Sequence, residues 1–464
     1  MKDPSGRHRS PNTLLRALIR DADVTYEALA HSVRAVAAEA GERLRTNRSA
    51  IAHWVAGAEP QAMTAVYLTE ALSRHLRRPV GPEEIGLLPP FQGHGVDWHT
   101  DTLRALHELG RLDLDMGRRR ALTAAAYSVT ALAVPDSDWW SHRAAQAADR
   151  PAASRLKVGR RDLHAVRDMV KPFSRADQRH GGGHARTAVV QYLTSDVAPR
   201  LGGTFTDDHV RQDMFSAASE LAYLSGWMAF DNAEHAAAQR YFTLSLSLAA
   251  EADDAPMAGH VLRAMAHQAV ELGHPGHAVR LARASVDGQR YTRAAPRERA
   301  LLGVVHARAL ASAGQPRAAA GALLRAEDDL AMAKPGDDEP GRVFFFGEAS
   351  LAHETACVLR DTGDLAGAQR EFRRSVRTRK ASSFTRTHAV TLGYLGSVQA
   401  RQGAIEEACA TWARALDAMD GIRSARARQT VTEMRRALSP VRGRGIPIVT
   451  ELDARAAVHL TESA

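Results

Sequence analysis

Apolar residues in the first ninety positions recur at the three- and four-residue spacing of short amphipathic helices. This pattern predicts helices over residues 12–20, 26–40, 48–55 and 65–76. In the third helix Ile51, Trp54 and Val55 lie at i, i+3 and i+4, so they form one buried stripe. We therefore predict a small all-α domain over residues 12–90, preceded by a disordered basic tail at residues 1–11.

The third helix presents polar and small residues opposite its buried stripe. Asn47 is a good N-cap, because its side-chain oxygen can accept a hydrogen bond from a free backbone N–H, and Gly57 ends the helix. Residues early in such a helix can reach base edges in the major groove, while nearby arginines contact phosphates. The predicted DNA-contacting residues are Thr25, Arg43, Arg45, Asn47, Arg48, Ser49, Ala52 and His53. An ordinary amphipathic helix with solvated charges would show the same pattern.

A second pattern, a repeated pair of helices, extends from about residue 211 to residue 438. Near the start of each second helix stands an alanine, and these are Ala236, Ala278, Ala319, Ala368 and Ala408. Five residues before each alanine is a turn residue, and these are Asp231, Gly273, Gly314, Gly363 and Gly403. Three units place a bulky residue four positions after the alanine, namely Leu323, Phe372 and Trp412. Such small and bulky pairs let two helices pack closely.

The repeat predicts an α-solenoid over residues 156–438, whose last helix, at 423–438, is a solvated cap. A generic all-α bundle is the alternative. Residues 91–155 are predicted to be a helical connector with a helix over 101–133 and an exposed linker over 134–154. In that linker the pair Trp139–Trp140 is expected to pack on one of the two domains rather than serve as a loose anchor for a partner. Residues 439–464 are predicted to be a tail with a short strand-like piece at 446–449.

The composition adds a basic balance to this all-α picture. The chain has 464 residues and a formal net charge of +8, which suits a polyanionic partner such as double-stranded DNA without proving one. No apolar run is long enough to cross a membrane and no signal-peptide pattern is present, so we expect a cytoplasmic, nucleoid-associated protein with no membrane partner. The two cysteines, Cys357 and Cys409, are too few for a disulfide framework.

Catalytic and metal-binding patterns are absent from the sequence. It contains no G-x-S-x-G, H-E-x-x-H or dinucleotide-binding motif, so we expect no enzymatic activity and no cofactor. His180 and His184 flank three glycines, but no cysteine or nearby carboxylate pair completes a set of metal ligands, so no metal is expected. The glycines predict a loop that opens a helix.

The N-terminal motifs resemble the Cro/repressor-like, or XRE, family of helix-turn-helix domains. The matching pieces are the short first helix, T-x-E-A-L-A at residues 25–30, R-S-x-I-x-x-W at residues 48–54 and G-x-x-P at residues 57–60. One departure is the segment from His31 to Thr46, which replaces the tight turn of that family. We expect the second helix to continue through Ala40 and a longer turn to begin at Gly41.

The repeats resemble tetratricopeptide repeats, with the best match at residues 392–415, although their spacing of 40 to 49 residues exceeds the usual ~34. The whole arrangement is similar to Streptomyces-type, that is actinobacterial, transcription regulators that join a Cro-like domain to a tetratricopeptide array. That resemblance implies a sequence-specific DNA-binding regulator of differentiation or secondary metabolism. A tetratricopeptide scaffold that contacts only other proteins is the alternative.

The first helices of stacked repeats line the concave side of the array. There we predict a groove for a signalling peptide, a small ligand or a protein partner, formed by Tyr223, Trp227, His267, Gln268, His306 and Arg308. Aromatic rings, hydrogen-bond donors and a fixed charge suit an extended peptide or a carboxylate-bearing ligand. Any of these residues could instead pack between repeats. Because one helix-turn-helix reads few base pairs, we also expect a homodimer.

Overall fold

The fold is all-α in the computed structural model. The described residues are 11–78, 80–81, 84–86, 98, 100–115, 126–129, 132, 134–334, 339–444 and 446–462. The predicted tail at residues 1–11 lies outside them except for its last residue. Within the described part the only strands are β1 (Lys157–Val158) and β2 (Thr204–Phe205), which pair in parallel. None of the described helices has the length and apolar character needed to cross a membrane.

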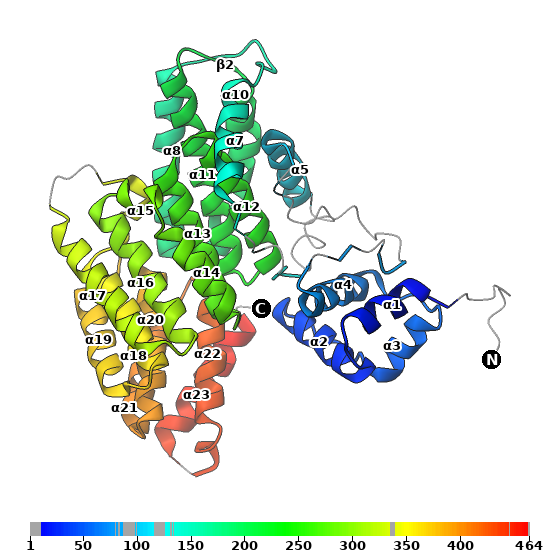
Figure 1. The fold of residues 1–464 in the computed structure, drawn as a ribbon. Helices are drawn as coiled ribbons and strands as arrows, with labels where there is room; N and C mark the ends of the chain where they lie inside the picture. Colours follow the sequence, from blue (N-terminus) through cyan, green and yellow to red (C-terminus); the bar gives the residue numbers. More distant parts are fainter. Residues whose placement is uncertain are drawn as a thin grey trace.

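The N-terminal domain contains the four helices that the sequence predicts (Figure 1). They are α1 (Thr13–Asp21), α2 (Tyr26–Glu39), α3 (Arg48–Val55) and α4 (Ala62–Leu76). Asn12, Thr25 and Asn47 cap the first three through hydrogen bonds from backbone N–H groups. A longer turn does begin at Gly41, which has φ +77°. Ile51 and Trp54 are buried in one core with α1, α2 and α4.

The connector differs from its prediction. Helix α5 (Thr102–Leu114) ends well before residue 133, and residues 134–154 contain α7 (Ser137–Ala148), which packs on α12 instead of forming an exposed linker. The tryptophan pair packs on the array, as expected: Trp140 lies under the guanidinium of Arg290, 4.9 Å from ring centroid to Cζ. The predicted helix extends too far, because residues 126–129 are not helical but are held between the two domains by backbone hydrogen bonds.

The array is a series of antiparallel helix pairs that stack side by side (Figure 1). It begins with α8 (Arg160–His180), α9 (Gly182–Tyr192), the π-helical turn η2 (Leu193–Val197) and α10 (Ala198–Leu201). The pairs follow as α11 (Asp208–Asp231) with α12 (His235–Glu251), α13 (Ala255–Glu271) with α14 (Pro275–Ser285), α16 (Pro296–Ser312) with α17 (Pro316–Met332), α18 (Glu348–Asp361) with α19 (Leu365–Thr378), and α20 (Thr385–Arg401) with α21 (Ile405–Ala418). A short helix, α15 (Gln289–Thr292), separates the second and third pairs.

Small residues allow these helices to pack closely, as the repeat pattern indicates. All five repeated alanines are buried. At Gly396 an added Cβ would lie 2.4 Å from the ring nitrogen of Trp412, and that nitrogen donates a 3.0 Å hydrogen bond to the carbonyl of Gly393. The tryptophan therefore fills space that only a glycine leaves open.

Two predictions about the array are wrong. Asp231 is not a turn residue but the last residue of α11, and the left-handed residue of that turn is Ala233, with φ +61°. Residues 439–464 are not a tail with a strand-like piece, because α23 (Pro447–Glu462) packs on α21 and α22 (Ala425–Leu438). Helix α22 is consequently half of a sixth pair and not the end of the array. The apolar piece at residues 446–449 covers only the start of α23, so its pattern does not show that a whole helix with a buried face follows.

The last helices of the array return to its first helices. Arg386 of α20 donates hydrogen bonds to Asp177 of α8, at 3.0 Å, and to Asp231 of α11, at 2.6 Å. All three side chains are almost fully buried. Burial raises the pKa of Asp177 to about 6, and the lowering by Arg386 is partly offset by the carboxylate of Asp231. Arg386 thus joins segments that are 209 and 155 residues away along the chain.

The three glycines predicted as a loop make the same junction possible, but only Gly181 lies between the helices, because Gly182 and Gly183 are the first residues of α9. The backbone N–H of Gly183 donates to the carbonyl of Arg423, at 3.0 Å, and the N–H of Arg423 donates to the carbonyl of His180, at 2.8 Å. A Cβ on Gly181 would lie 2.4 Å from the Arg423 carbonyl oxygen, and one on Gly182 would lie 2.3 Å from that of Met228. The glycines serve close backbone packing between the two ends of the array.

Trp54 is 9% exposed, so its ring supports the N-terminal domain and does not face a DNA groove. We expect Trp54→Ala to destabilise α1–α4 by about 3–5 kcal/mol, because it leaves a large cavity in a small core. Hydrogen exchange of the amides in α2 and α4 of the full chain measures this loss. Unchanged protection of those amides would contradict the structural role of Trp54.

Removal of the Arg386 guanidinium should open the junction between the ends of the array. Arg386→Met leaves two buried carboxylates without their cation, and we expect a loss of about 3–5 kcal/mol in the stability of the array. Arg373→Met is the matched control, because Arg373 pairs with Glu407 at the exposed surface and should lose less than about 1 kcal/mol. Urea denaturation followed by circular dichroism compares the two. Equal effects would show that the junction does not hold the array together.

Candidate functional site

The structure leaves the polar face of α3 open. Arg48, Ser49 and His53 are exposed and Ala52 is half-buried. Arg43 and Arg45 are exposed in the turn before the helix. Within the described part of the chain no carboxylate lies within ion-pair distance of these three arginines. Their charges are therefore available to an anionic partner.

The other two predicted DNA-contacting residues have structural roles. The Asn47 side chain accepts a 3.0 Å hydrogen bond from the N–H of Ala50, and the Thr25 hydroxyl accepts one of 3.2 Å from the N–H of Ala28. Both are exposed at helix N-termini, where free N–H groups attract anions. The long turn that places α3 is tied to α2, because Arg34 donates a hydrogen bond to the carbonyl of Thr46.

Residues 126–129, called the interdomain segment from here on, connect the N-terminal domain to the array. On one side the N–H of Val129 donates a 2.9 Å hydrogen bond to Glu70 of α4, and Arg74 donates one of 2.9 Å to the carbonyl of Tyr127. On the other side the Gln239 side chain of α12 accepts from the N–H of Ser128, at 2.9 Å, and donates to its carbonyl, at 2.7 Å. The segment is therefore bonded to both domains like a short strand between two partners.

Ion pairs strengthen the same contact. Arg74 binds Glu39 through two hydrogen bonds of 2.7 Å and Glu70 through one of 2.8 Å, so it joins α2 to α4. His274 of the array lies 3.5 Å from Glu39, and its ring stacks on Tyr127. Burial raises the pKa of Glu39, but hydrogen bonds from Arg74 and His274 outweigh it and lower that pKa below its usual value. Glu39 is therefore charged at neutral pH and pairs with Arg74, while the His274 ring contacts the same carboxylate.

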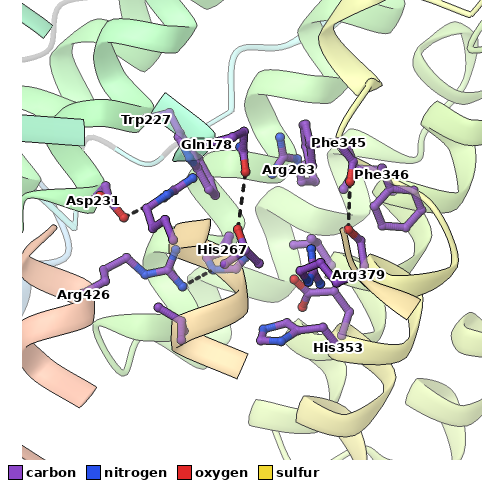
Figure 2. Close-up of a pocket in the computed structure, with 17 residues that line it drawn as sticks. Gln178, Trp227, Asp231, Arg263, His267, Phe345, Phe346, His353, Arg379 and Arg426 are labelled. Carbon is purple, nitrogen blue, oxygen red and sulfur yellow. Dashed lines mark hydrogen bonds and ion pairs between the residues drawn. The ribbon is translucent and has the colours of Figure 1, made fainter. Parts of the chain in front are cut away.

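Three adjoining cavities follow the concave side of the array. The outer cavity, of about 750 Å³, lies between α8, α11 and residues 339–344. It shares Glu220, Arg342 and Phe344 with a middle cavity, which in turn shares Gln178, Trp227 and Phe345 with an inner cavity. Their volumes are about 750, 30 and 70 Å³ from the outer to the inner cavity, so the groove that they form is narrowest at the middle cavity. Figure 2 shows the inner cavity.

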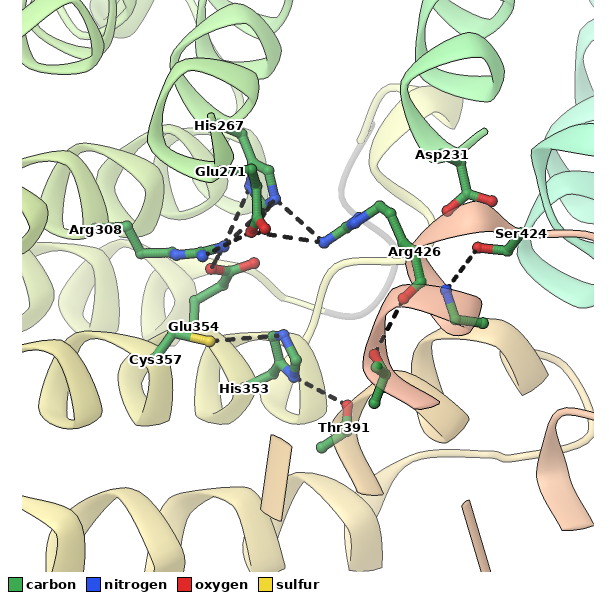
Figure 3. Close-up of polar contacts among 12 residues, drawn as sticks. Asp231, His267, Glu271, Arg308, His353, Glu354, Cys357, Thr391, Ser424 and Arg426 are labelled. Carbon is green, nitrogen blue, oxygen red and sulfur yellow. Dashed lines mark hydrogen bonds and ion pairs between the residues drawn. The ribbon is translucent and has the colours of Figure 1, made fainter. Parts of the chain in front are cut away.

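Four of the six predicted groove residues lie at or next to this groove. Trp227 and His267 line the inner cavity, and Tyr223 lines the middle one. Arg308 lies next to His267 and is 3% exposed. It pairs with Glu271 at 3.0 Å and with Glu354 at 3.2 Å (Figure 3). Its charge is thus already neutralised by two carboxylates.

The other two predicted groove residues face elsewhere. Gln268 is fully buried between helices, where its side chain donates a 2.9 Å hydrogen bond to the carbonyl of His235. His306 lines none of the three cavities, and its pKa is lowered by burial and by the charges of Arg325 and Arg283. The reason is helical rotation: Gln268 is one residue from His267 and His306 is two from Arg308, so neither shares a helix face with its neighbour.

Sequence reasoning missed the cations of the inner cavity. Its lining includes Arg263, Arg379, Arg386 and Arg426, but only two carboxylates, Asp231 and Glu354. For Arg263, Arg386 and Arg426 the signal in the sequence is an arginine at a position that the helical period assigns to the buried face, whereas Arg379 directly follows α19. Such a position predicts burial, but the partner of each arginine depends on the fold.

The histidines and the cysteine beside the cavity do not add charge. Burial lowers the pKa of His267 and of His353 well below the usual value, and nearby arginines lower them further. Burial raises the pKa of Cys357 to about 12, so its sulfur, 3.8 Å from the His353 ring, is a neutral thiol (Figure 3). The pair therefore lacks the thiolate that nucleophilic catalysis requires.

Comparison with known proteins finds one family model and one solved structure. Residues 15–88 match the family model of the SP15 N-terminal domain. The crystal structure of a Rap protein complexed with Competence and Sporulation Factor aligns with 65% of this chain and 89% of its own chain, at 13% sequence identity and a TM-score of 0.39. No curated protein matches the chain by sequence. The region similar to the SP15 N-terminal domain comprises α1–α4 and the residues that follow them.

Proposed function

We propose that this protein is a sequence-specific DNA-binding transcription regulator whose helical array receives a peptide, small-molecule or protein signal. The N-terminal domain acts in this proposal as an XRE-type helix-turn-helix of an actinobacterial regulator. It is cytoplasmic and nucleoid-associated, it binds rather than catalyses, and a role in differentiation or secondary metabolism follows from the sequence resemblance. The observation that carries the proposal is the group of exposed, unpaired arginines on α3 and in the turn before it.

These arginines suit DNA because of where they stand. Arg48 and Ser49 are in the first turn of α3, from which side chains reach base edges in the major groove. Arg43 and Arg45 precede the helix and suit phosphate contacts, which position a protein without reading sequence. Since one such domain reads few base pairs, a homodimer on two half-sites completes the proposal.

The groove and the N-terminal domain must be coupled for a signal to act. A ligand shifts an equilibrium only if it binds the DNA-competent and incompetent forms with different affinity. The interdomain segment is the physical route: Gln239 is on α12, whose partner α11 lines the groove, and Glu70 and Arg74 are on α4 of the N-terminal domain. A shift of α11 and α12 therefore moves the interdomain segment through the hydrogen bonds of Gln239. The segment in turn moves α4 through its hydrogen bonds with Glu70 and Arg74.

The DNA-binding proposal is tested by substitution on and before α3. Arg48→Ala and His53→Ala should each cost about 1–3 kcal/mol in binding to the preferred site and relax sequence preference. Arg43→Ala, the matched control, should weaken binding to all sequences alike. Footprinting of the full chain on selected duplexes should show two protected half-sites about one helical turn apart. If no duplex is bound more tightly than random DNA, the scaffold interpretation replaces this one.

The coupling proposal is tested at Gln239. Gln239→Leu removes both hydrogen bonds to Ser128, and we expect the amide of Ser128 to exchange on the order of tenfold faster. The preferred-site affinity of the full chain should change as well, because the array then constrains α4 less strongly. Gln289→Leu is the control, since Gln289 is exposed on the array and remote from the interdomain segment. Identical DNA affinity and exchange in both variants would remove the interdomain segment as the route.

A further inference from the structure

The inner cavity contains two buried guanidinium groups that have no carboxylate partner. Arg263 of α13 is 2% exposed and Arg379, directly after α19, is 7% exposed. Both line the cavity and both are labelled in Figure 2. Across the described residues no carboxylate lies within ion-pair distance of either one. A buried charge without a counter-charge is costly, so proteins rarely keep one without a use.

Arg263 is held in place by neutral groups only. It donates a 2.7 Å hydrogen bond to the hydroxyl of Tyr223, and it lies 3.0 Å from a ring nitrogen of His260. Its guanidinium stacks over the rings of Tyr223 and Trp227, at 5.7 and 5.4 Å from their centroids. Burial lowers the pKa of His260 to about 3, so that ring is neutral. The side chain is thus positioned but its charge is not compensated.

Arg379 is held in a similar way on the opposite part of the array. It donates hydrogen bonds to the carbonyl of Ala349, at 3.0 Å, and to the hydroxyl of Ser375, at 3.2 Å, and its Nε has no partner. Burial lowers its pKa to about 10, and the attraction of Glu354 does not reverse this. The guanidinium remains charged at neutral pH.

The carboxylates of the cavity are already engaged. Asp231 accepts hydrogen bonds from Arg386 and from the N–H of Gly182, and Glu354 pairs with Arg308. Arg426 lies 3.8 Å from Glu271, which also binds Arg308. The charges of Arg263 and Arg379 are consequently the ones that an incoming group would meet.

We propose that the inner cavity binds the C-terminal carboxylate of a peptide whose body lies along the groove, an inference that rests on the proposed role of the groove as the signal site. A carboxylate matches the planar donor array of a guanidinium. The inner cavity, of about 70 Å³, exceeds several-fold the space that one ordered water needs, which suits a compact anionic group. Phe345, Phe346 and Trp227 supply apolar contact for the last side chain.

The outer part of the groove suits the rest of such a peptide. The outer cavity has about ten times the volume of the inner one, and its lining mixes bases and acids, among them Arg167 and Asp213, which pair at 2.9 Å. Because that lining is balanced in charge and the inner end is not, an anionic terminus is drawn inward and the N-terminus remains at the mouth. The groove therefore binds a peptide in one orientation, with the C-terminus at the inner cavity.

The experiment uses two pools of fluorescein-labelled peptides of random sequence, six residues long, that differ only in a free C-terminal carboxylate or a C-terminal amide. The full-length protein is incubated with each pool, and bound peptides are counted by fluorescence and identified by mass spectrometry. We expect retention of the acid pool to exceed that of the amide pool by about tenfold, the effect of losing one charge-assisted contact. Equal retention of the two pools would overturn the proposal.

Substitutions of single arginines show which residues cause the preference for peptides with a free C-terminal carboxylate. Arg263→Met and Arg379→Met should each abolish the difference between the pools, whereas Arg175→Met, an exposed residue of the outer cavity, should preserve it. Without peptide, Arg379→Met should melt at a temperature equal to or above that of the parent, because it removes an uncompensated buried charge. A clear loss of stability would instead assign Arg379 a structural role and overturn its assignment to the site.

Three further outcomes bear on this inference and on the proposed function on which it rests. If acetate or inorganic phosphate competes as well as the acid peptides do, the cavity is a small-anion site and the proposal fails. If the acid preference is found but no duplex DNA is bound, the peptide site stands and the transcriptional role fails. If DNA is bound and both pools are retained alike, the transcriptional role stands and the terminal carboxylate is excluded.

Discussion

The array depends on one buried cation, Arg386, which holds α8 and α11 against α20. Stacked helix pairs interact with their neighbours only, so nothing in the repeat itself brings the first and last pairs together. Arg386 does this through Asp177 and Asp231, and the glycines at 181–183 let the two backbones touch. Closure turns the concave side into a groove whose inner cavity lies at the junction, and that cavity is where the unpaired arginines are found.

Closure also explains why the inner cavity is chemically unlike the outer one. Near the junction, side chains of α8, α11, α13, α18, α20 and α22 meet around one small cavity. Charges there interact strongly, and buried histidines such as His267 and His353 become neutral. The outer cavity is wider, and its lining pairs acids with bases, both at exposed positions (Arg167–Asp213) and at largely buried ones (Arg342–Glu220). It can therefore accept varied sequences without a strong electrostatic preference.

The contact between the two domains follows a different principle, because it is made by backbone groups of a short segment. Ser128 and Val129 place their N–H and carbonyl groups against Gln239 and Glu70, so the segment satisfies its polar backbone through side chains of both domains. Hydrogen bonds of this kind are directional, and a small rotation of either helix weakens them. A linker held in this way transmits a change in the array to the N-terminal domain better than a solvated linker does.

The sequence by itself determined the features that rest on local interactions. The caps at Thr25 and Asn47, the buried stripe of α3 and the alanine positions of the repeats all follow from contacts within one helix or between adjacent helices. Only the tertiary structure decided which residues reach the groove, that Asp231 belongs to an ion pair and not a turn, and that the last residues of the chain form α23. These features depend on how all the helix pairs of the array pack together. The hydrophobic period within one helix carries no information about that packing.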